Sequence, residues 1–430
     1  MTRSPGGSIL EDQRPGHISP GPGTRGIDMA NHLEGGRMMF RNTAITTAIA
    51  CCAVTASIHG SAQDSDNDRL RRNLDQKYII GPTTSSQMDY RIDYQNRVPT
   101  RPGDELAWLT VKDGAIYVVD TSNRVTRLDA ENGDVIWSKA AGSSMHPVHG
   151  VDRATIRMPM TDGTLADQDV VLVTKQTGIY VHQDSDGSLI QTQNVNRMPS
   201  TSTTVGNNHI IYGTNDGRII WHQFRVGYPW KANQISGKII HTPVLVDDEV
   251  YGVSVDGDII AMDNRTTNRI WDKRLISGIQ TRPIISDDIV FIAGTDQYLW
   301  ALDRADGRTI WKYFASSPLV QNPTLLGDRI YQQVDGEGLL CLTTMTPDKI
   351  DGDVVWKQPE VTGNVITSNK DHLWAWDQAS RMMWMLDATN GNVISKTSIP
   401  LADFLFCTTR EDGQFYALNR DGRVERLSPR

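Results

Sequence analysis

The feature that most constrains this chain is a repeat with a period of about 40 residues. Most repeats place a short apolar run, such as IIAMD or LWALD, so that it ends at the same position of the unit. The gaps between successive positions are 54, 40, 40, 40, 40, 44 and 41 residues. A period of this length, with several short strands in each unit, is typical of a β-propeller. The eight positions are Asp129, Gln183, Gln223, Asp263, Asp303, Thr343, Asp387 and Ser428.

Residues 282–313 show the four strands that we expect in one repeat. The apolar runs PII, IVFIAG, YLWALD and TIWKY are separated by turns rich in Asp, Ser and Gly. Short β-rich runs bounded in this way indicate antiparallel strands joined by hairpins. Asp-Gly and Asn-Gly pairs, which supply the positive φ of tight hairpin turns, recur in the third turn. One such sheet cannot bury both of its faces, so we expect the sheets to stack as blades around an axis.

Two residue types recur at fixed places in these repeats. A tryptophan lies on the predicted fourth strand, and we expect it to pack between neighbouring blades, with ligand stacking as the alternative. An aspartate ends the third strand, where we expect it to accept backbone N–H bonds from the turn. These structural repeat residues are Asp129, Trp137, Asp263, Trp271, Asp303, Trp311, Trp356 and Asp387.

The two ends of the repeat region predict how the ring closes. Residues 412–428 align without a gap to 113–129, but only the first repeat continues into a fourth strand, DVIWSK. An open strand edge invites aggregation. We expect YRIDYQNRV (90–98) to supply the missing strand. We therefore predict an all-β fold: an eight-bladed propeller of four-stranded antiparallel blades over residues 88–430, closed by an N-terminal strand.

The region before the propeller has three predicted parts. Residues 1–37 are rich in Gly, Pro, Ser and Arg, and we expect a disordered or untranslated leader. Residues 38–62 have the pattern of a signal peptide with cleavage after Ala62, and 63–87 form a linker. The alternative to simple cleavage is a lipid anchor at Cys51. Both alternatives place the mature protein in the periplasm or outside the cell, either free or attached to the outer membrane.

The sequence offers little for catalysis. A net charge of −8 argues against general nucleic-acid binding. We find no HExxH, Cys-x-x-Cys or phosphate-binding glycine loop, and expect no catalytic, cofactor-binding or metal-binding residues. His146 and His149 share the longest insertion, for which we expect a solvated loop, with a metal site as the alternative. Cys341 and Cys407 fall in blades 6 and 8, too far apart for a disulfide.

The units ALDRADGRTIWKY and RLDAENGDVIWSK resemble the repeat of pyrroloquinoline-quinone (PQQ)-type propellers, over residues 105–430 or so. Two branches of this superfamily matter. The quinoprotein dehydrogenases add cofactor ligands and a vicinal disulfide that stacks on the quinone. The BamB-like propellers are exported scaffolds that help to assemble outer-membrane β-barrels. The Cys-Cys pair here, Cys51-Cys52, precedes the first blade. The chain is thus most similar to the BamB-like outer-membrane assembly factors.

This resemblance implies an exported, non-enzymatic scaffold or adaptor that works as a monomer, without PQQ or another cofactor, and binds protein partners in the cell envelope. One alternative is a PQQ-dependent oxidoreductase, and another is a carbohydrate- or polymer-binding propeller. We expect the interface in the 144–168 insertion first, and in the tryptophan-rich seventh repeat second. For Trp374, Trp376 and Trp384 of that repeat, packing in the core is the competing expectation.

Overall fold

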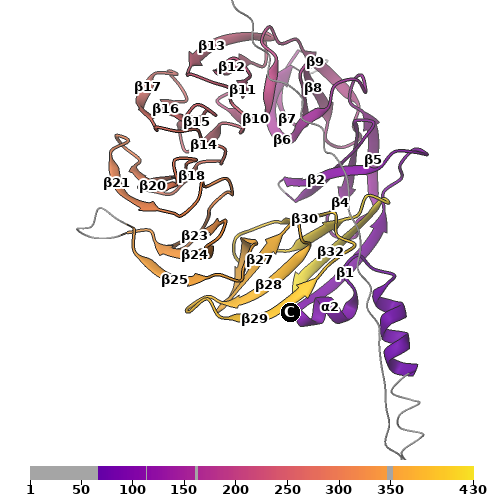
Figure 1. Ribbon diagram of the computed structural model, residues 1–430. Helices are drawn as coiled ribbons and strands as arrows, with labels where there is room; N and C mark the ends of the chain where they lie inside the picture. The colour runs from indigo at the N-terminus through magenta and orange to yellow at the C-terminus, as the bar shows by residue number, and fades with distance from the viewer. Residues whose placement is uncertain (1–65, 113, 160–162, 346–351) are drawn as a thin grey trace, which may run out of the picture. The chain divides into compact units, whose positions relative to one another are not determined.

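The computed structural model describes residues 66–430, except for 113, 160–162 and 346–351. These residues form eight four-stranded antiparallel sheets, which confirms the predicted eight-bladed propeller. The first strand of each blade faces the centre of the ring, and the fourth lies at the rim (Figure 1). The predicted leader and signal peptide, with Cys51, lie outside the described residues. Neither of the helices within the described residues is long and apolar enough to cross a membrane.

Seven blades use four consecutive strands, and the eighth combines β1 with the last three strands. Blades 1 to 4 consist of β2 (Leu106–Lys112), β3 (Ala115–Asp120), β4 (Arg124–Asp129), β5 (Val135–Ala140); β6 (Val148–Pro159), β7 (Leu165–Lys175), β8 (Gly178–Gln183), β9 (Leu189–Gln193); β10 (Pro199–Gly206), β11 (His209–Thr214), β12 (Arg218–Gln223), β13 (Tyr228–Gln234); and β14 (Val244–Val246), β15 (Glu249–Val253), β16 (Asp258–Asp263), β17 (Arg269–Arg274). Blades 5 to 8 consist of β18 (Ile284–Ile285), β19 (Ile289–Ala293), β20 (Tyr298–Asp303), β21 (Thr309–Phe314); β22 (Thr324–Leu326), β23 (Arg329–Val334), β24 (Gly338–Thr343), β25 (Val354–Gln358); β26 (Asn364–Asn369), β27 (His372–Asp377), β28 (Met382–Asp387), β29 (Val393–Ser398); and β30 (Phe404–Cys407), β31 (Phe415–Leu418), β32 (Arg423–Pro429), β1 (Tyr90–Arg97).

The repeat aspartates hold the third hairpin turn of their blades. Asp303 Oδ1 accepts the N–H of Ala305 at 2.8 Å. The same bond, to the residue two places further on, occurs at the other three aspartates, Asp129, Asp263 and Asp387. Gly307 completes the turn with φ of +74°, and a Cβ there would lie 2.6 Å from the Trp271 ring. The turn therefore needs glycine both for its backbone conformation and for close contact with the preceding blade.

The four repeat tryptophans each join their own blade, which is blade 1, 4, 5 or 6, to the next one. Each indole is buried and donates its N–H to a backbone carbonyl of the following blade. The acceptor is always the residue directly after the repeat position given above, which in these blades is the last residue of the third strand. These bonds run from Trp137 to Asp184 (2.8 Å), Trp271 to Arg304 (2.8 Å), Trp311 to Thr344 (2.8 Å) and Trp356 to Ala388 (3.2 Å). The indole thus buries a large apolar surface and satisfies its one polar group in the same contact.

β1 closes the ring in the way that the ends of the repeat region predicted. It pairs antiparallel with β32, from Tyr90 opposite Pro429 to Arg97 opposite Arg423. Tyr94 of β1 then replaces the missing tryptophan of the last blade. Its hydroxyl donates to the carbonyl of Ala130, which directly follows Asp129, the first of the eight repeat positions. The contact between blades 8 and 1 therefore resembles the four tryptophan contacts, with a residue from the opposite end of the chain.

The segment 63–87 was expected to be a linker, and part of its described stretch packs on the propeller. Residues 66–75 are helical, and α2 (Pro82–Gln87) follows. Between them, Ile79 and Ile80 are buried in the core of the closing blades. Their N–H groups donate to Glu425 Oε2 of β32, at 2.7 and 3.1 Å. Two apolar side chains and a buried carboxylate therefore fix this segment to the propeller.

Glu425 is expected to make stability depend on pH. Its side chain is 0 % exposed. Burial raises the pKa of its carboxyl from 4.5 to about 8, although the N–H groups of Ile80 and Ile79 favour the charged form. Between these two values the folded protein holds a proton that the unfolded chain has released. The stability that this proton contributes to the folded protein is therefore complete below pH 4.5 and is lost as the pH rises through about 8.

The variant Glu425→Gln removes this titration. We expect it to match the wild type at about pH 4 and to be more stable by on the order of 5 kcal/mol at pH 9, since each unit of pKa shift corresponds to about 1.4 kcal/mol. Urea unfolding of both proteins at a series of pH values measures the difference. Parallel curves for the two proteins would contradict the prediction.

Candidate functional site

The insertion proposed as an interface is a long β-hairpin. β6 and β7 pair from Val148 opposite Lys175 out to Pro159 opposite Leu165. β8 pairs with β7 only over Val170–Lys175. Residues 155–159 and 165–169 thus form a two-stranded extension of blade 2, here called the β6–β7 ribbon. The expected solvated loop is wrong for the described residues of this segment, because alternating apolar side chains give the hairpin a buried face.

The two faces of the β6–β7 ribbon differ in character. Ile156 and Met158 are buried in one cluster with Ile210 and Tyr212 of blade 3. The opposite face is exposed and largely polar. It carries Thr155, Arg157, Leu165, Asp167 and Asp169. The ribbon is therefore anchored on one side and free to contact another molecule on the other.

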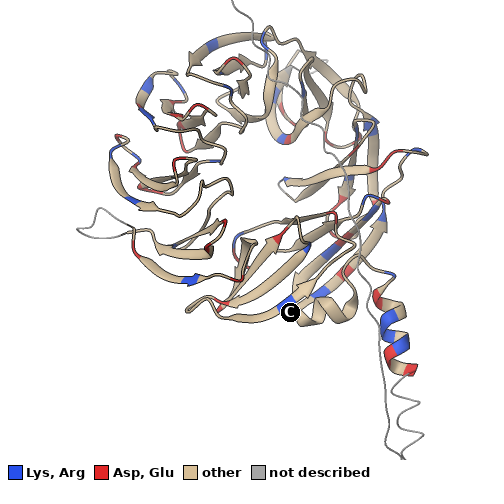
Figure 2. Ribbon diagram, viewed as in Figure 1, with Lys and Arg blue, Asp and Glu red and all other residues tan. Residues whose placement is uncertain are grey.

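A buried carboxylate fixes the base of this ribbon. Asp184 accepts a hydrogen bond from the Tyr117 hydroxyl at 2.6 Å. It also pairs with Arg127 and with Arg153, each at 3.1 Å. Arg153 continues to Asp169 of the ribbon at 2.9 Å. Acidic and basic residues are interspersed along the blades in general (Figure 2), but here they form one network that joins blades 1 and 2 to the ribbon.

The tryptophans of blade 7 do not form a binding surface. Trp374, Trp376 and Trp384 are all buried. Trp374 packs edge-on against Tyr90 of β1, with ring centroids 5.6 Å apart, and donates to the carbonyl of Met88. Trp374 and Trp376 therefore belong to the core between blade 7 and the closing blade, and Trp384 belongs to the core between blades 6 and 7. The second proposed interface is wrong, and the competing expectation of core packing holds.

A cavity of about 420 Å³ opens on the inner strands of the propeller. β2, β6 and β10 supply most of its wall, and the segments that lead into β14 and β18 complete it. Lys112 Nζ pairs with Asp152 Oδ1 at 3.0 Å. Asp152 Oδ2 accepts bonds from the hydroxyls of Ser202 (2.6 Å) and Thr203 (3.1 Å). We call this space the axial cavity.

The two histidines of the insertion do not act together. His149 lies on β6 and lines the axial cavity. Burial, with a smaller contribution from Lys238, lowers the pKa of its imidazole. His146 precedes the strand, and its carbonyl accepts a bond from Asn123. Within the described ranges, no group of three His, Cys, Asp or Glu side chains could hold a metal ion.

Cys341 and Cys407 are free cysteines on β24 and β30, in blades 6 and 8 as expected. Burial raises the pKa of each thiol to about 11. Both therefore stay protonated near neutral pH, and neither has the low pKa of a reactive thiol.

Several residues at the centre of this architecture were missed in the sequence. Tyr94 could have been found. It is an aromatic residue in the strand predicted to be the fourth strand of the last blade, and the fourth strand carries a tryptophan in several other blades. Arg282 could have been found by alignment, since it occupies the repeat position of Ser202, Thr242 and Asn322, 40 residues apart. Nothing in the sequence marks the bond of Glu425 to Ile79 and Ile80, whose partners are more than 340 positions apart.

A family model and a related sequence carry the same description. The sequence model of the family described as outer membrane protein assembly factor BamB matches residues 94–313. A protein of that name from Shewanella oneidensis is 23 % identical over 188 residues, which cover 40 % of this chain and 44 % of the relative. The chain thus matches less than half of that relative's length.

Solved structures show the same fold at low sequence identity. The crystal structure of BamB from Moraxella catarrhalis superposes with a TM-score of 0.61 and 17 % identity, covering 79 % of this chain and 97 % of that one. The C-terminal WD40 domain of Sif2 superposes with a TM-score of 0.57 and 10 % identity, covering 79 % and 98 %. The computationally designed Ika8 protein gives 0.58 and 12 %, covering 76 % and 96 %.

Proposed function

Because this chain belongs to the family of the outer membrane protein assembly factor BamB, we propose that it is an exported, non-enzymatic adaptor for the assembly of outer-membrane proteins. The observation that carries this proposal is the family match, which runs from β1 through the end of blade 5. An adaptor needs a stiff frame and a surface for partners rather than a reaction centre. The joined blades supply the frame.

The proposed docking surface is the exposed face of the β6–β7 ribbon. Blade 3 holds the ribbon through Ile156 and Met158, so its outer face is ordered before a partner arrives. A partner that binds a preformed surface loses less conformational entropy than one that must order a loop. Arg157 and Asp167 face each other across the ribbon and give this surface charges of both signs. We expect the partner to be a protein of the cell envelope.

The setting that we propose is the periplasm, either free or attached to the outer membrane. It rests on the sequence of the leader and on the family. Mass spectrometry of the mature N-terminus would distinguish cleavage after Ala62 from a lipid anchor at Cys51.

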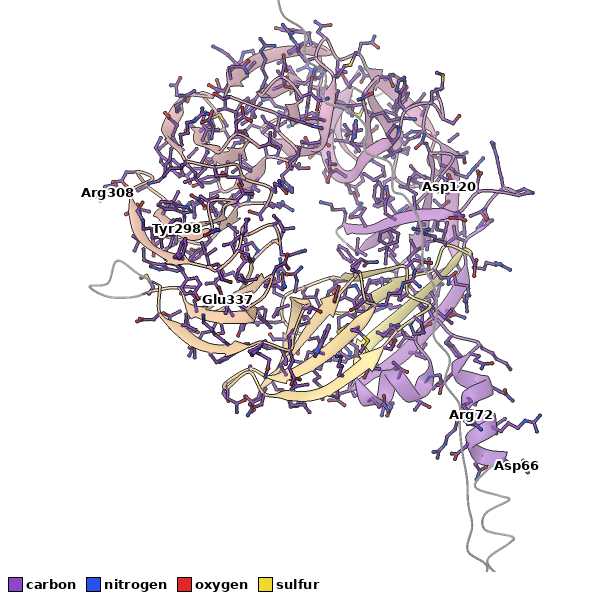
Figure 3. All side chains as sticks on the ribbon, viewed as in Figure 1. Asp66, Arg72, Asp120, Tyr298, Arg308 and Glu337 are labelled. Atoms are coloured by element: carbon purple, nitrogen blue, oxygen red, sulfur yellow. The ribbon has the colours of Figure 1, made fainter. Side chains whose placement is uncertain are left out.

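Site-specific cross-linking tests the adaptor proposal. A photo-reactive residue at position 157 is expected to cross-link to an envelope protein in living cells. Position 308 is the matched control, because Arg308 is also an exposed arginine but lies on a turn at the rim of blade 5 (Figure 3). Deletion of the gene is expected to lower the amount of outer-membrane β-barrel proteins, and the wild-type gene should restore it. Unchanged β-barrel levels would overturn the proposal.

We also propose that the protein works without PQQ. Purified protein mixed with the quinone and calcium is expected to bind it more weakly than micromolar, and not to reduce a dye with common alcohols or aldoses. The described cysteines support this, because Cys341 and Cys407 lie in different blades and cannot form a vicinal pair. Substrate-dependent dye reduction would favour an oxidoreductase instead.

A further inference from the structure

The contact between blades 2 and 3 lacks the tryptophan that joins other blades. Gln191 stands eight residues after Gln183, where blades 1, 4 and 5 carry tryptophan. Gln193, two residues further on, donates its amide N–H to the carbonyl of Phe224 at 3.0 Å. Phe224 directly follows the repeat position Gln223, so this bond reaches the backbone acceptor that the tryptophans use elsewhere. A fully buried amide thus takes the place of an indole between these two blades.

A histidine lies at the same contact, at a repeat position that is apolar in most blades. His222 is 0 % exposed, and its Nε2 lies 3.0 Å from Gln193 Oε1. An amide oxygen can only accept, so Nε2 carries the proton of the neutral ring. The residues directly before the eight repeat positions, all of them buried, are Leu128, His182, His222, Met262, Leu302, Leu342, Leu386 and Leu427.

The two histidines of this series differ in what they join. His182 Nδ1 donates to the carbonyl of Gly187 at 3.0 Å, which lies in the same blade. The bond of His222 to Gln193 instead crosses from blade 3 to β9 of blade 2. His222 is therefore the one whose protonation bears on the contact between blades 2 and 3.

The second nitrogen of His222 has no partner. Its Nδ1 is buried and forms no hydrogen bond within the described residues. Around the ring lie β11 with Ile210 opposite, β13 with Pro229 opposite, and Gln193 of β9. The titratable group that acts on the ring from these elements is His209 of β11, which disfavours a further positive charge. A proton on Nδ1 would therefore be a buried charge without an acceptor among these groups.

This environment makes the neutral ring the stable form. Burial, and then the neighbouring imidazole of His209, lower the pKa of His222 from 6.5 to about 4. Between these values the unfolded chain holds a proton that the folded protein does not. The stability that neutral His222 contributes is therefore complete above pH 6.5 and declines as the pH falls toward about 4.

His222 lies within the apolar cluster that anchors the β6–β7 ribbon. Ile220 and Phe224 flank it two residues away on either side, and side chains two apart on a strand share one face. Both belong to the cluster in which Ile156 and Met158 of the ribbon are buried. Blades 2 and 3 are neighbours in the ring (Figure 1). A change at His222 therefore acts on the contacts that hold the ribbon in place.

We propose that the contact between blades 2 and 3 is a pH-sensitive joint, in which protonation of His222 releases the β6–β7 ribbon from blade 3. The proton binds Nδ1, and the charged ring can reach water only if the two blades separate at this point. The ordered docking face is then present near neutral pH and lost in acid. This consequence for docking rests on the proposed adaptor function, whereas the joint itself does not.

Hydrogen–deuterium exchange with mass spectrometry tests the joint on the full chain. Protection of β6, β7 and β12 is measured at about pH 5 and pH 7.5 and corrected for the intrinsic exchange rate. We expect it to fall by about 30-fold in acid, the ratio given by the two pKa values of His222. The strands of blade 5 should keep their protection. A local readout is needed because Glu425 shifts the stability of the whole protein in the opposite direction.

The variant His222→Gln keeps a donor for Gln193 but cannot titrate. It should show the same ribbon protection at both pH values. His222→Leu introduces the residue that five other blades carry and should lose the pH response as well. If the leucine variant fails to fold, the glutamine variant still decides. His372→Gln is the matched control, because His372 begins β27 in blade 7, and it should respond to pH as the wild type does.

Two results would overturn the joint. One is ribbon protection in the wild type that is the same at both pH values. The other is an equal loss of protection in the wild type and in His222→Gln, which would assign the response to another group.

Cross-linking at position 157, repeated with cells at both pH values, tests the consequence for docking. It should weaken in acid for the wild type and persist for His222→Gln. Equal cross-linking of the wild type at both pH values would separate docking from the joint. No cross-link at either pH would remove the adaptor proposal and leave the exchange result standing, so the two proposals can fail separately.

Discussion

Deletion of residues 88–99 is expected to lower the free energy of unfolding by roughly 6–12 kcal/mol, because four apolar side chains leave the core at about 1.5–3 kcal/mol each. Met88, Tyr90 and Val98 are buried, and Ile92 packs against the cluster that contains Met88 and Tyr90. The deletion also removes the hydrogen bonds of β1 to β32 and the contact of Tyr94 with blade 1. Urea unfolding at two protein concentrations measures both stability and association.

The exposed edge of β32 is expected to make the deleted protein associate. A peptide of residues 88–99 added in trans should restore the monomer and part of the stability, which keeps the test valid even if the deleted protein is barely folded. Tyr94→Phe is a mild companion variant, since it loses only the bond to the Ala130 carbonyl, worth about 1 kcal/mol. A deleted protein that remains monomeric and melts at the wild-type temperature would refute closure by β1.

Replacement of Trp311 by alanine is expected to cost about 3–5 kcal/mol, the range for emptying a large buried aromatic site. Trp311 is 0 % exposed and packs in one cluster with residues of blades 5 and 6. Its ring lies 5.8 Å from that of Phe291, and its N–H is bound to the Thr344 carbonyl. The variant would leave a cavity between two blades and a carbonyl without its partner.

Chemical unfolding of Trp311→Ala measures this cost, and Trp230→Ala is the matched control. Trp230 is half-buried and stacks on His209 at 4.7 Å, but it joins no blade to the next through its N–H. We expect its loss to cost less than about 2 kcal/mol. A loss below about 1 kcal/mol for Trp311 would mean that the blades do not depend on this contact.

The sequence by itself determined the blades and their closure. Seven of the eight blades are built entirely from hairpins whose paired residues lie within about 30 positions of one another, so apolar runs, turn residues and the period of the repeat define them locally. Asp303 and Trp311 have counterparts in other blades for the same reason. The contact of the aspartate lies within its own blade, and the contact of the tryptophan reaches the next blade along the chain. The missing fourth strand of the last repeat then left one segment, 90–98, to close the ring.

The tertiary structure alone decided which residues meet across larger separations. Residues 155–159 and 165–169 lie in the insertion that was expected to be a loop, and they form a ribbon because blade 3 offers Ile210 and Tyr212 to its apolar face. Ile79 meets Glu425 only because eight blades bring the last strands back beside the first. Local patterns cannot encode such contacts, since they depend on the number of blades and on the rotation that each blade adds.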